Sequence, residues 1–167
     1  MPNLEIERKW LIARPDPAIL AAQPGAAASE IVQTYLTAPD GVSRRVRART
    51  AGGITTYTRT TKHRIDAMTA DEDEAVIPAD EYTALLRDAD PACRPIAKTR
   101  WCIPHAGQTL EIDLYPFWDK QAVLEIELPA PDAPVEPPGW LTVLCEVTGD
   151  RAYSNHSLAR RIPDEIA

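Results

Sequence analysis

Charged side chains recur at every second position in several short segments of this sequence. In the first segment, Glu5, Glu7 and Lys9 share one face of a strand, and Leu4, Ile6 and Trp10 share the other. Residues two apart lie on the same face of a β-strand, so each segment would present a row of charges. Basic rows can bind phosphate oxygens, and acidic rows can hold a hard divalent cation. The other rows are Arg45, Arg47 and Arg49; Glu72 and Glu74; Lys98 and Arg100; Glu111 and Asp113; and Glu125 and Glu127.

The rows together predict a closed sheet whose interior is charged. Exposure to solvent is the simpler interpretation of any single row, because antiparallel sheets often have one wet face. Most of these rows, however, carry charges of one sign, which favours one shared interior. We therefore predict an α+β fold, in which a closed or nearly closed antiparallel β-barrel of about eight strands forms a tunnel with flanking helices.

Helices are expected in four places. The segment 78–87 has apolar residues at helical spacing, proline and acids at its start and an arginine near its end. A second helix is expected over 15–22, a third near 140–144, and a final turn or two from 154–155, where either residue could cap it. These helices would cover the apolar outer face of the barrel.

Length and charge restrict the functional classes. The chain has 167 residues, and we expect residues 1–167 to form a single domain. It carries 18 Lys and Arg against 25 Asp and Glu, a net charge of −7. This balance argues against a nucleic-acid coat or a basic membrane-surface protein. No apolar run is typical of a membrane span or a signal peptide, so we expect a cytoplasmic protein with no nucleic-acid or membrane partner. The oligomeric state is left open, with a homodimer as one alternative.

Cysteines and histidines give no sign of a metal site in the sequence. Cys93, Cys102 and Cys145 fit neither a disulfide framework nor the spacing of a zinc site. We expect them as small, buried or half-buried residues. The three histidines stand at no ligand spacing and are expected to be exposed or locally hydrogen-bonded.

A triphosphate would suit the predicted interior. Its negative charges lie along its length, where arginine and lysine side chains from opposite walls could bind them. Carboxylates in the same interior would repel the substrate and one another. A divalent cation resolves this conflict, because Mg²⁺ or Mn²⁺ joins carboxylates to phosphate oxygens.

The ordered set of motifs resembles the CYTH superfamily, the triphosphate tunnel metalloenzymes, and most of all its short single-domain bacterial members. The resemblance begins with the ExExK motif at Glu5-Ile6-Glu7-Arg8-Lys9 and covers essentially the whole chain. The motifs that follow are Gln33-Thr34-Tyr35-Leu36, the Arg-x-Arg strand at 45–49, Lys62, Glu72-x-Glu74, Lys98-Thr99-Arg100-Trp101, Leu110-Glu111-Ile112-Asp113, Leu124-Glu125-Ile126-Glu127 and the segment 146–155.

The resemblance implies a role for each row. The metal, Mg²⁺ or Mn²⁺, would be held by Glu5, Glu7 and Glu127, with Asp113 as a further candidate ligand. The substrate-binding residues would be Lys9, Arg45, Arg47, Arg49, Lys62, Lys98 and Arg100. Those expected to act in catalysis are Lys9, Lys98, Arg100 and Glu125, and the supporting acids are Glu72, Glu74 and Glu111.

Two departures from the family pattern affect the phosphate contacts. Three arginines at 45–49 could supply the family's two, and the choice stays open, with the first two favoured. The family often has an arginine two residues before the first glutamate of the mid-chain pair, where this chain has Ala70. That contact is either missing or supplied by Arg64 or Arg59.

The favoured function is hydrolysis of a triphosphate, with inorganic tripolyphosphate as the first candidate substrate. Two alternatives within the same superfamily are adenylate cyclisation and hydrolysis of thiamine or nucleoside triphosphates. A non-catalytic binder of polyphosphate or nucleotides is a third alternative. The many carboxylates disfavour a pure binder, since they would surround a polyanion without a use.

Overall fold

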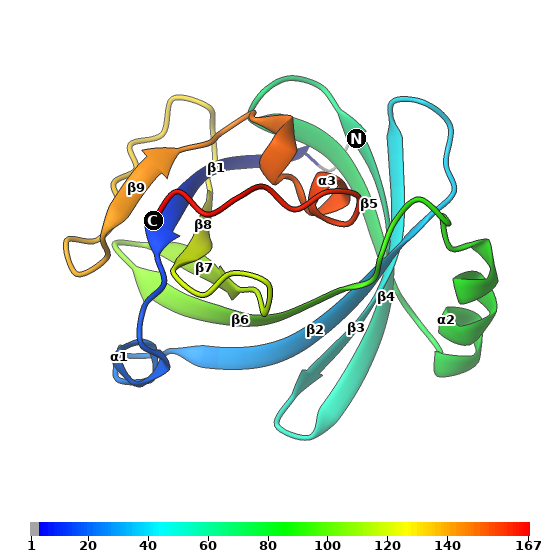
Figure 1. Cartoon of the computed structure of the whole chain (residues 1–167), viewed down its shortest axis with the longest axis horizontal. Coiled ribbons are helices and arrows are strands. Elements are labelled where there is room, and N and C mark those ends of the chain that lie inside the picture. The colour runs from blue at the N-terminus through cyan, green and yellow to red at the C-terminus, as the bar shows by residue number, and fades with distance from the viewer. Residues whose placement is uncertain (1–3) are drawn as a thin grey trace.

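The computed structural model describes residues 4–167 and contains an antiparallel sheet that closes on itself (Figure 1). The described strands are β1 (Leu4–Ala13), β2 (Ala27–Leu36), β3 (Val42–Ala51), β4 (Ile54–Arg64), β5 (Thr69–Ile77), β6 (Ile96–His105), β7 (Gln108–Leu114), β8 (Gln121–Glu127) and β9 (Val143–Glu146). Their order is β5-β4-β3-β2-β6-β7-β8-β1-β9, and pairing of β5 with β1 closes a ring of eight strands. This confirms the predicted barrel, with β9 as one additional strand.

Strand β1 closes the barrel because its two edges have different partners. One edge pairs with β8 from Glu7 to Ala13. The other edge pairs first with β5, through residues 4–6, and then with β9, from Trp10 onward. The first half of β1, which carries the acidic residues of the ExExK motif, therefore lies at the closing seam.

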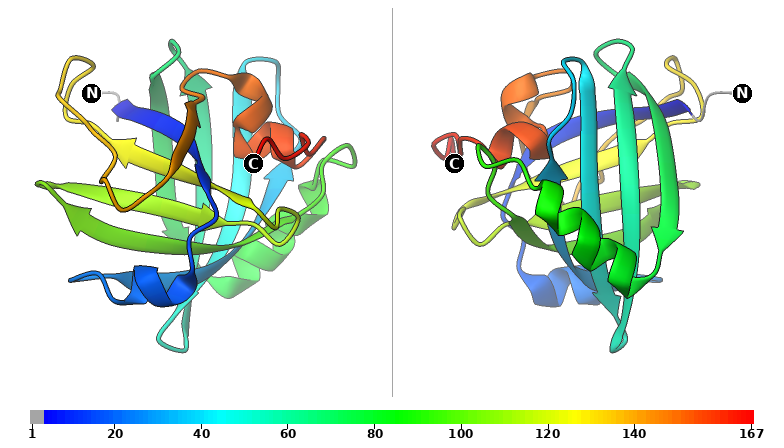
Figure 2. Two further views of the ribbon diagram at one scale, coloured as in Figure 1. Left: turned by 60° about the vertical axis from the view of Figure 1, so that its left-hand side comes forward. Right: turned by 90° about the vertical axis from the view of Figure 1, so that its right-hand side faces the viewer.

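The outer face of β1, β6, β7 and β8 is apolar and is covered by short connecting segments. Trp10, Ile112 and Leu124 are buried on this face. They pack with Leu20 of α1 (Pro17–Ala21) and with Leu141, which follows a long proline-rich loop. Figure 2 shows α1 beside the barrel wall. The predicted helix over 15–22 is thus confirmed in shortened form, with Asp16 as its N-cap.

One end of the bore is filled by apolar side chains. Leu11 and Val123 continue the inward-facing rows of β1 and β8, and both are fully buried. Tyr115 and Trp118 pack on them together with Leu158 of α3 (Asn155–Leu158). Of the two candidate caps, Ser154 and Asn155, it is Ser154 that caps α3. The charged rows therefore lie against an apolar floor, which restricts water at that end.

The outer face of β3 and β4 is covered by α2 (Ala79–Leu85) and the 3₁₀ turn η1 (Leu86–Asp88), as seen in the right-hand view of Figure 2. The aromatic rings of Tyr57 and Tyr82 meet there with centroids 4.6 Å apart. Val46 and Ile77 complete this small apolar cluster. The predicted helix over 78–87 is confirmed.

The helix predicted near 140–144 is wrong. Val143 instead begins β9 and pairs with Ile12 on the edge of β1 that β5 leaves free. An unpaired strand edge offers backbone hydrogen bonds that outweigh a short segment's helical preference. A second 3₁₀ turn, η2 (Arg151–Tyr153), precedes α3. Within residues 4–167, the helices are all too short or too polar to cross a membrane.

Candidate active site

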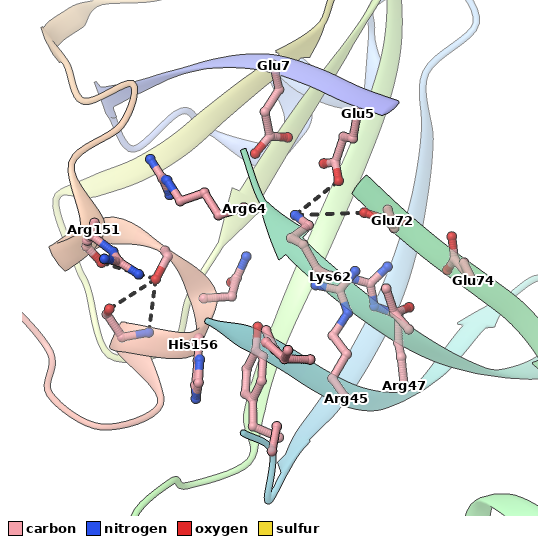
Figure 3. A pocket seen from close by; sticks show the side chains of 18 of the residues that line it. Glu5, Glu7, Arg45, Arg47, Lys62, Arg64, Glu72, Glu74, Arg151 and His156 are labelled. Atoms are coloured by element: carbon pink, nitrogen blue, oxygen red, sulfur yellow. Dashed lines mark hydrogen bonds and ion pairs between the residues drawn. The ribbon is translucent and has the colours of Figure 1, made fainter. Parts of the chain in front are cut away.

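A cavity of about 880 Å³ lies in the bore of the barrel (Figure 3). The charged rows contribute to its wall, because the pleat directs every second side chain of each strand inward, and the loop between β2 and β3 also lines it. The predicted site residues that line it are Glu5, Glu7, Lys9, Arg45, Arg47, Arg49, Lys62, Glu72, Glu74, Arg100, Glu111, Glu125 and Glu127. Two predicted residues, Lys98 and Asp113, do not line it.

Lys98 and Asp113 are buried beside the cavity, on the inward-facing rows of β6 and β7. Each is at most 2% exposed, and Lys98 Nζ lies 2.8 Å from Asp113 Oδ2. Arg100 donates two further hydrogen bonds to the same carboxylate, at 2.7 and 2.9 Å, and a third to Glu111 at 2.8 Å. Of this group, Arg100 and Glu111 reach the cavity. The buried pair therefore holds Arg100 in place, while Lys98 and Asp113 lie in the interior of the barrel without lining the cavity.

The charges of neighbouring residues and burial shift the pKa values of Asp113 and Lys98. Burial alone would raise the pKa of Asp113, but the charges of Arg100 and Lys98 outweigh it and hold the pKa well below its usual value. Burial, together with the charges of Arg100 and Arg47, lowers the pKa of Lys98 to about 7 although Asp113 opposes this change. An ionised Asp113 that accepts hydrogen bonds from two cations has little capacity left for a metal ion.

A chain of carboxyl groups runs along the closing seam. Glu7 lies directly opposite Glu127 in the β1 and β8 pair. Burial and the charge of Glu125 raise the pKa of Glu7 well above its usual value. Burial and the hydrogen bond to Glu5 raise the pKa of Glu72 to about 8. These shifts mean that the cations nearby do not neutralise all of the negative charge.

Two lysines are interleaved with this chain. Lys62 Nζ lies 3.0 Å from a Glu5 oxygen and 3.7 Å from Glu72, as Figure 3 shows. Lys9 Nζ lies 3.2 Å from Glu125. Burial tends to lower the pKa of both lysines, but the neighbouring carboxylates outweigh it and raise the pKa. Both lysines are therefore fully protonated cations in the cavity.

All three arginines of β3 line the cavity, but they differ in their partners. Arg47 donates to Gln33 Oε1 at 3.0 Å, and Arg49 donates to Ser29 at 2.9 Å. The Nε atom of Arg45 is buried and has no hydrogen-bond partner in the described part of the chain. Burial and the charges of Arg45 and Arg100 lower the pKa of Arg47 to about 10. The arginine side of the cavity thus has excess positive charge, which a polyanion would neutralise.

Of the two arginines that could replace the missing contact at Ala70, the structure places Arg64 in the cavity. Arg64 lines the wall, and in the β4 and β5 pair it stands directly opposite Ala70. Arg59 has the other parity and lies on the outer face, 3.9 Å from Glu81. The two-residue spacing between Lys62 and Arg64 was the signal that distinguishes Arg64 from Arg59.

The rim adjoining α3 contributes a further set of polar side chains. Those that line the cavity are Tyr35, Asp90, Arg151, Ser154, Asn155, His156, Ser157 and Arg160. Figure 3 places Arg151 and His156 across the cavity from Lys62. Apart from Tyr35, which belongs to β2, these residues come from turns and short helices, where no two-residue repeat marks them in the sequence.

Comparison with solved structures identifies the relatives of this fold. The chain is similar to the inorganic triphosphatase NE1496, with 30% identity and a TM-score of 0.60, over 96% of this chain and 97% of that chain. It is also similar to PH1819 from Pyrococcus horikoshii OT3, with 21% identity and a TM-score of 0.57, over 80% of this chain and 79% of that one. HpAC1 from Hippeastrum, for which a dominant triphosphatase activity is described, has the same fold at 17% identity and a TM-score of 0.51, over 77% of this chain and 81% of that one. No family model and no curated protein sequence matches the chain.

Proposed function

Because this chain belongs to the CYTH superfamily of triphosphate tunnel metalloenzymes, we propose that it is a metal-dependent triphosphatase with inorganic tripolyphosphate as its substrate. The observation that carries this proposal is the convergence of acidic and basic rows on one cavity. Acids along the seam and excess positive charge on β3 are what a complex of a divalent cation with a polyphosphate requires.

The cavity wall favours an inorganic substrate over a nucleotide. Its aromatic rings, among the described residues, are those of Tyr35 and His156. These two rings stack on each other with centroids 4.7 Å apart. Little aromatic surface is therefore left on which a nucleobase could stack.

The carboxylates of the seam fit Mg²⁺ or Mn²⁺ in their chemistry. We assign Glu5, Glu7 and Glu127 as the residues that would hold the ion, since carboxylate oxygens are the ligands these hard cations prefer. Glu7 and Glu127 form no ion pair within residues 4–167. The raised pKa of Glu7 reflects negative charge that a cation would neutralise. Asp113 does not fit as a ligand, because Lys98 and Arg100 already occupy its oxygens. When bound, the ion supplies Lewis-acid stabilisation of charge on the phosphate oxygens.

The side chains of the wall would bind and orient the substrate. Arg45, Arg47 and Arg49 line one side of the cavity, where they would bind phosphate oxygens, and Lys62 and Lys9 would add point charges at the seam. Glu125 holds the ammonium group of Lys9, so we propose a positioning role for this acid. Catalysis would rest on orientation and on electrostatic stabilisation by groups that are already in place.

Arg100 is proposed as the cation that stabilises charge developing in the reaction. Three hydrogen bonds to Asp113 and Glu111 fix its guanidinium group at the wall. A fixed cation needs no reorganisation when the transition state forms. Lys98 acts through this group, so we revise its proposed role from substrate contact to positioning.

Phosphate release from a panel of substrates tests the proposal. Tripolyphosphate, thiamine triphosphate and nucleoside triphosphates would each be assayed with Mg²⁺ and with Mn²⁺, and with EDTA as the control. We expect metal-dependent release of orthophosphate, fastest from tripolyphosphate. Pyrophosphate with a cyclic nucleotide would indicate a cyclase. Tight binding of tripolyphosphate without turnover would indicate a binder, and either result would overturn the proposal.

A further inference from the structure

Three side chains with metal-binding atoms lie together at the rim of the cavity, away from the carboxylates of the seam. Asp90 and Cys93 belong to the turn between η1 and β6, and His156 belongs to α3. One potential ligand atom from each lies within 4.8 Å of the other two. Within residues 4–167, no other three His, Cys, Asp or Glu side chains bring their ligand atoms within 4.8 Å of one another.

Hydrogen bonds of the turn present the carboxylate and the thiol on the same side. Asp90 Oδ1 accepts from the amide of Ala92 at 2.9 Å, and the amide of Cys93 donates to the Asp90 carbonyl at 3.0 Å. The amide of Arg94 donates to the carbonyl of Ala159, just after α3, at 2.7 Å. The turn and α3 are thus joined by backbone contacts next to the three side chains, which limits the motion needed to bring the ligand atoms together.

The imidazole of His156 has a fixed ring plane and one nitrogen without a hydrogen-bond partner among the described residues. Its ring stacks on Tyr35 with an interplanar angle of 16°, which fixes the ring plane. Its Nε2 atom is buried and has no hydrogen-bond partner among the described residues. A buried polar atom without a partner is costly unless something outside the chain satisfies it.

We propose that Asp90, Cys93 and His156 form a transition-metal site, for which Zn²⁺ is the fitting ion. Zinc binds thiolate, imidazole and carboxylate ligands in a tetrahedral arrangement, whereas Mg²⁺ and Mn²⁺ favour oxygen ligands. Tetrahedral geometry requires ligand atoms roughly 3.5 Å apart, so side-chain adjustment of about 1 Å would complete the site. The thiol proton of Cys93 leaves to solvent as the metal–sulfur bond forms. This inference does not depend on the proposed function.

Three protein ligands leave one position of a tetrahedral ion open. Asp90 and His156 both line the cavity, so water or a phosphate oxygen from the bore could reach the open position. Arg160 donates to the other Asp90 oxygen at 3.1 Å and can keep that contact, because a carboxylate binds zinc through one oxygen. The site therefore differs from the seam in both ligand type and location.

Bound zinc would fasten α3 to the turn before β6. Asn155, the neighbour of His156, accepts hydrogen bonds from Lys98 at 3.3 Å and from the hydroxyl of Tyr115. Lys98 in turn pairs with the carboxylate that holds Arg100. An ion at the rim would thus stabilise one wall of the cavity, and the protein should become more stable as the ion binds.

Titration with Co²⁺, a spectroscopic substitute for zinc, tests the site directly. The metal-free protein would be titrated in excess Mg²⁺, which occupies oxygen-only sites. We expect one Co²⁺ per chain with a thiolate-to-cobalt charge-transfer band, and we expect Zn²⁺ to abolish the band. Cys93→Ser should remove the band, and His156→Gln should weaken Co²⁺ binding at least tenfold. Cys145→Ser is the matched control, since Cys145 is also a free, half-buried cysteine, and it should leave the band unchanged.

Thermal unfolding provides a second readout that keeps the proposal falsifiable if a variant is destabilised. Zn²⁺ should raise the Tm of the wild-type protein and of Cys145→Ser, but not that of Cys93→Ser. The proposal would be overturned by the absence of a charge-transfer band in the wild-type protein. Persistence of the band in Cys93→Ser, or its equal loss in Cys145→Ser, would overturn it as well.

Discussion

Arg64 of β4 stands directly opposite Ala70 of β5, and both positions face the bore. Ala70 is the position at which the sequence resemblance leads us to expect an arginine. Side chains opposite each other in an antiparallel pair have Cβ atoms about 5 Å apart. An arginine on either strand can therefore place its guanidinium group in the same part of the cavity.

The first prediction is that an arginine at position 70 can replace the arginine at position 64. Arg64→Ala should raise the KM for tripolyphosphate about tenfold, the effect expected from losing one charge-assisted hydrogen bond. Adding Ala70→Arg to that variant should restore much of the loss, because the charge returns from the opposite strand. Steady-state kinetics measure both effects. Arg59→Ala is the control, since Arg59 lies on the outer face. Equal effects of the Arg64 and Arg59 substitutions would contradict the assignment.

The second prediction concerns the acids of the seam. Glu7→Gln or Glu127→Gln should lower metal-dependent phosphate release at least about 100-fold while leaving the fold intact, because each removes an anionic oxygen from the assigned metal site. Phosphate release and circular dichroism measure the two effects. Glu136→Gln, at an exposed position outside the cavity, is the control. Full activity in either seam variant would refute the metal assignment.

Substitutions in β3 distinguish arginines that contact the substrate from an arginine that only adds charge to the outer surface. Arg45→Ala and Arg47→Ala should each raise KM about tenfold, with a smaller change in kcat, because these groups bind the phosphates of the ground state as well as of the transition state. Arg44→Ala is a close control, because Arg44 has the opposite parity and donates to the carbonyl of Thr37. If kcat collapsed while KM stayed constant, the arginines would instead act mainly in the transition state.

The buried ion pair of Lys98 with Asp113 should contribute to the free energy of unfolding. Lys98→Met should lower the free energy of unfolding by about 3 kcal/mol, because it removes one partner from a buried ion pair. Arg160→Met breaks an exposed pair with Asp90 and should cost less than about 1 kcal/mol. Denaturant unfolding measures both values. Similar values for the two variants would mean that Lys98 is not a structural cation.

The carboxyl chain predicts a pH dependence of stability in protein treated with EDTA. Because the pKa of Glu72 is raised to about 8, the folded state keeps a proton that the unfolded state loses above pH 4.5. The unfolded state then binds fewer protons, so stability falls as pH rises from about 5 to 8. In Glu72→Gln, this fall should be shallower, which unfolding at a series of pH values can measure. An unchanged slope would contradict the shifted pKa.

Much of the fold could be predicted from the sequence, and most of the predicted site residues line the cavity. The inward parity of Glu5, Lys9 and Arg47 follows from the two-residue repeat of a β-strand, which is a local property. The same repeat predicted the barrel, since charged rows of different sign need a shared interior. The roles assigned to these residues in metal and substrate binding stay predictions that kinetics must test.

Tertiary structure decided which side chains meet. Strand register, which depends on contacts distant in the sequence, placed Arg64 opposite Ala70 and buried Lys98 with Asp113 in the barrel interior. The free edge of β1 turned the segment at Val143 from the predicted helix into a strand. The meeting of Cys93 with His156 likewise required the packing of α3 against a turn. A strand's repeat fixes the direction of each side chain, but only closure of the barrel and packing of its ends bring residues from distant segments within reach of one another.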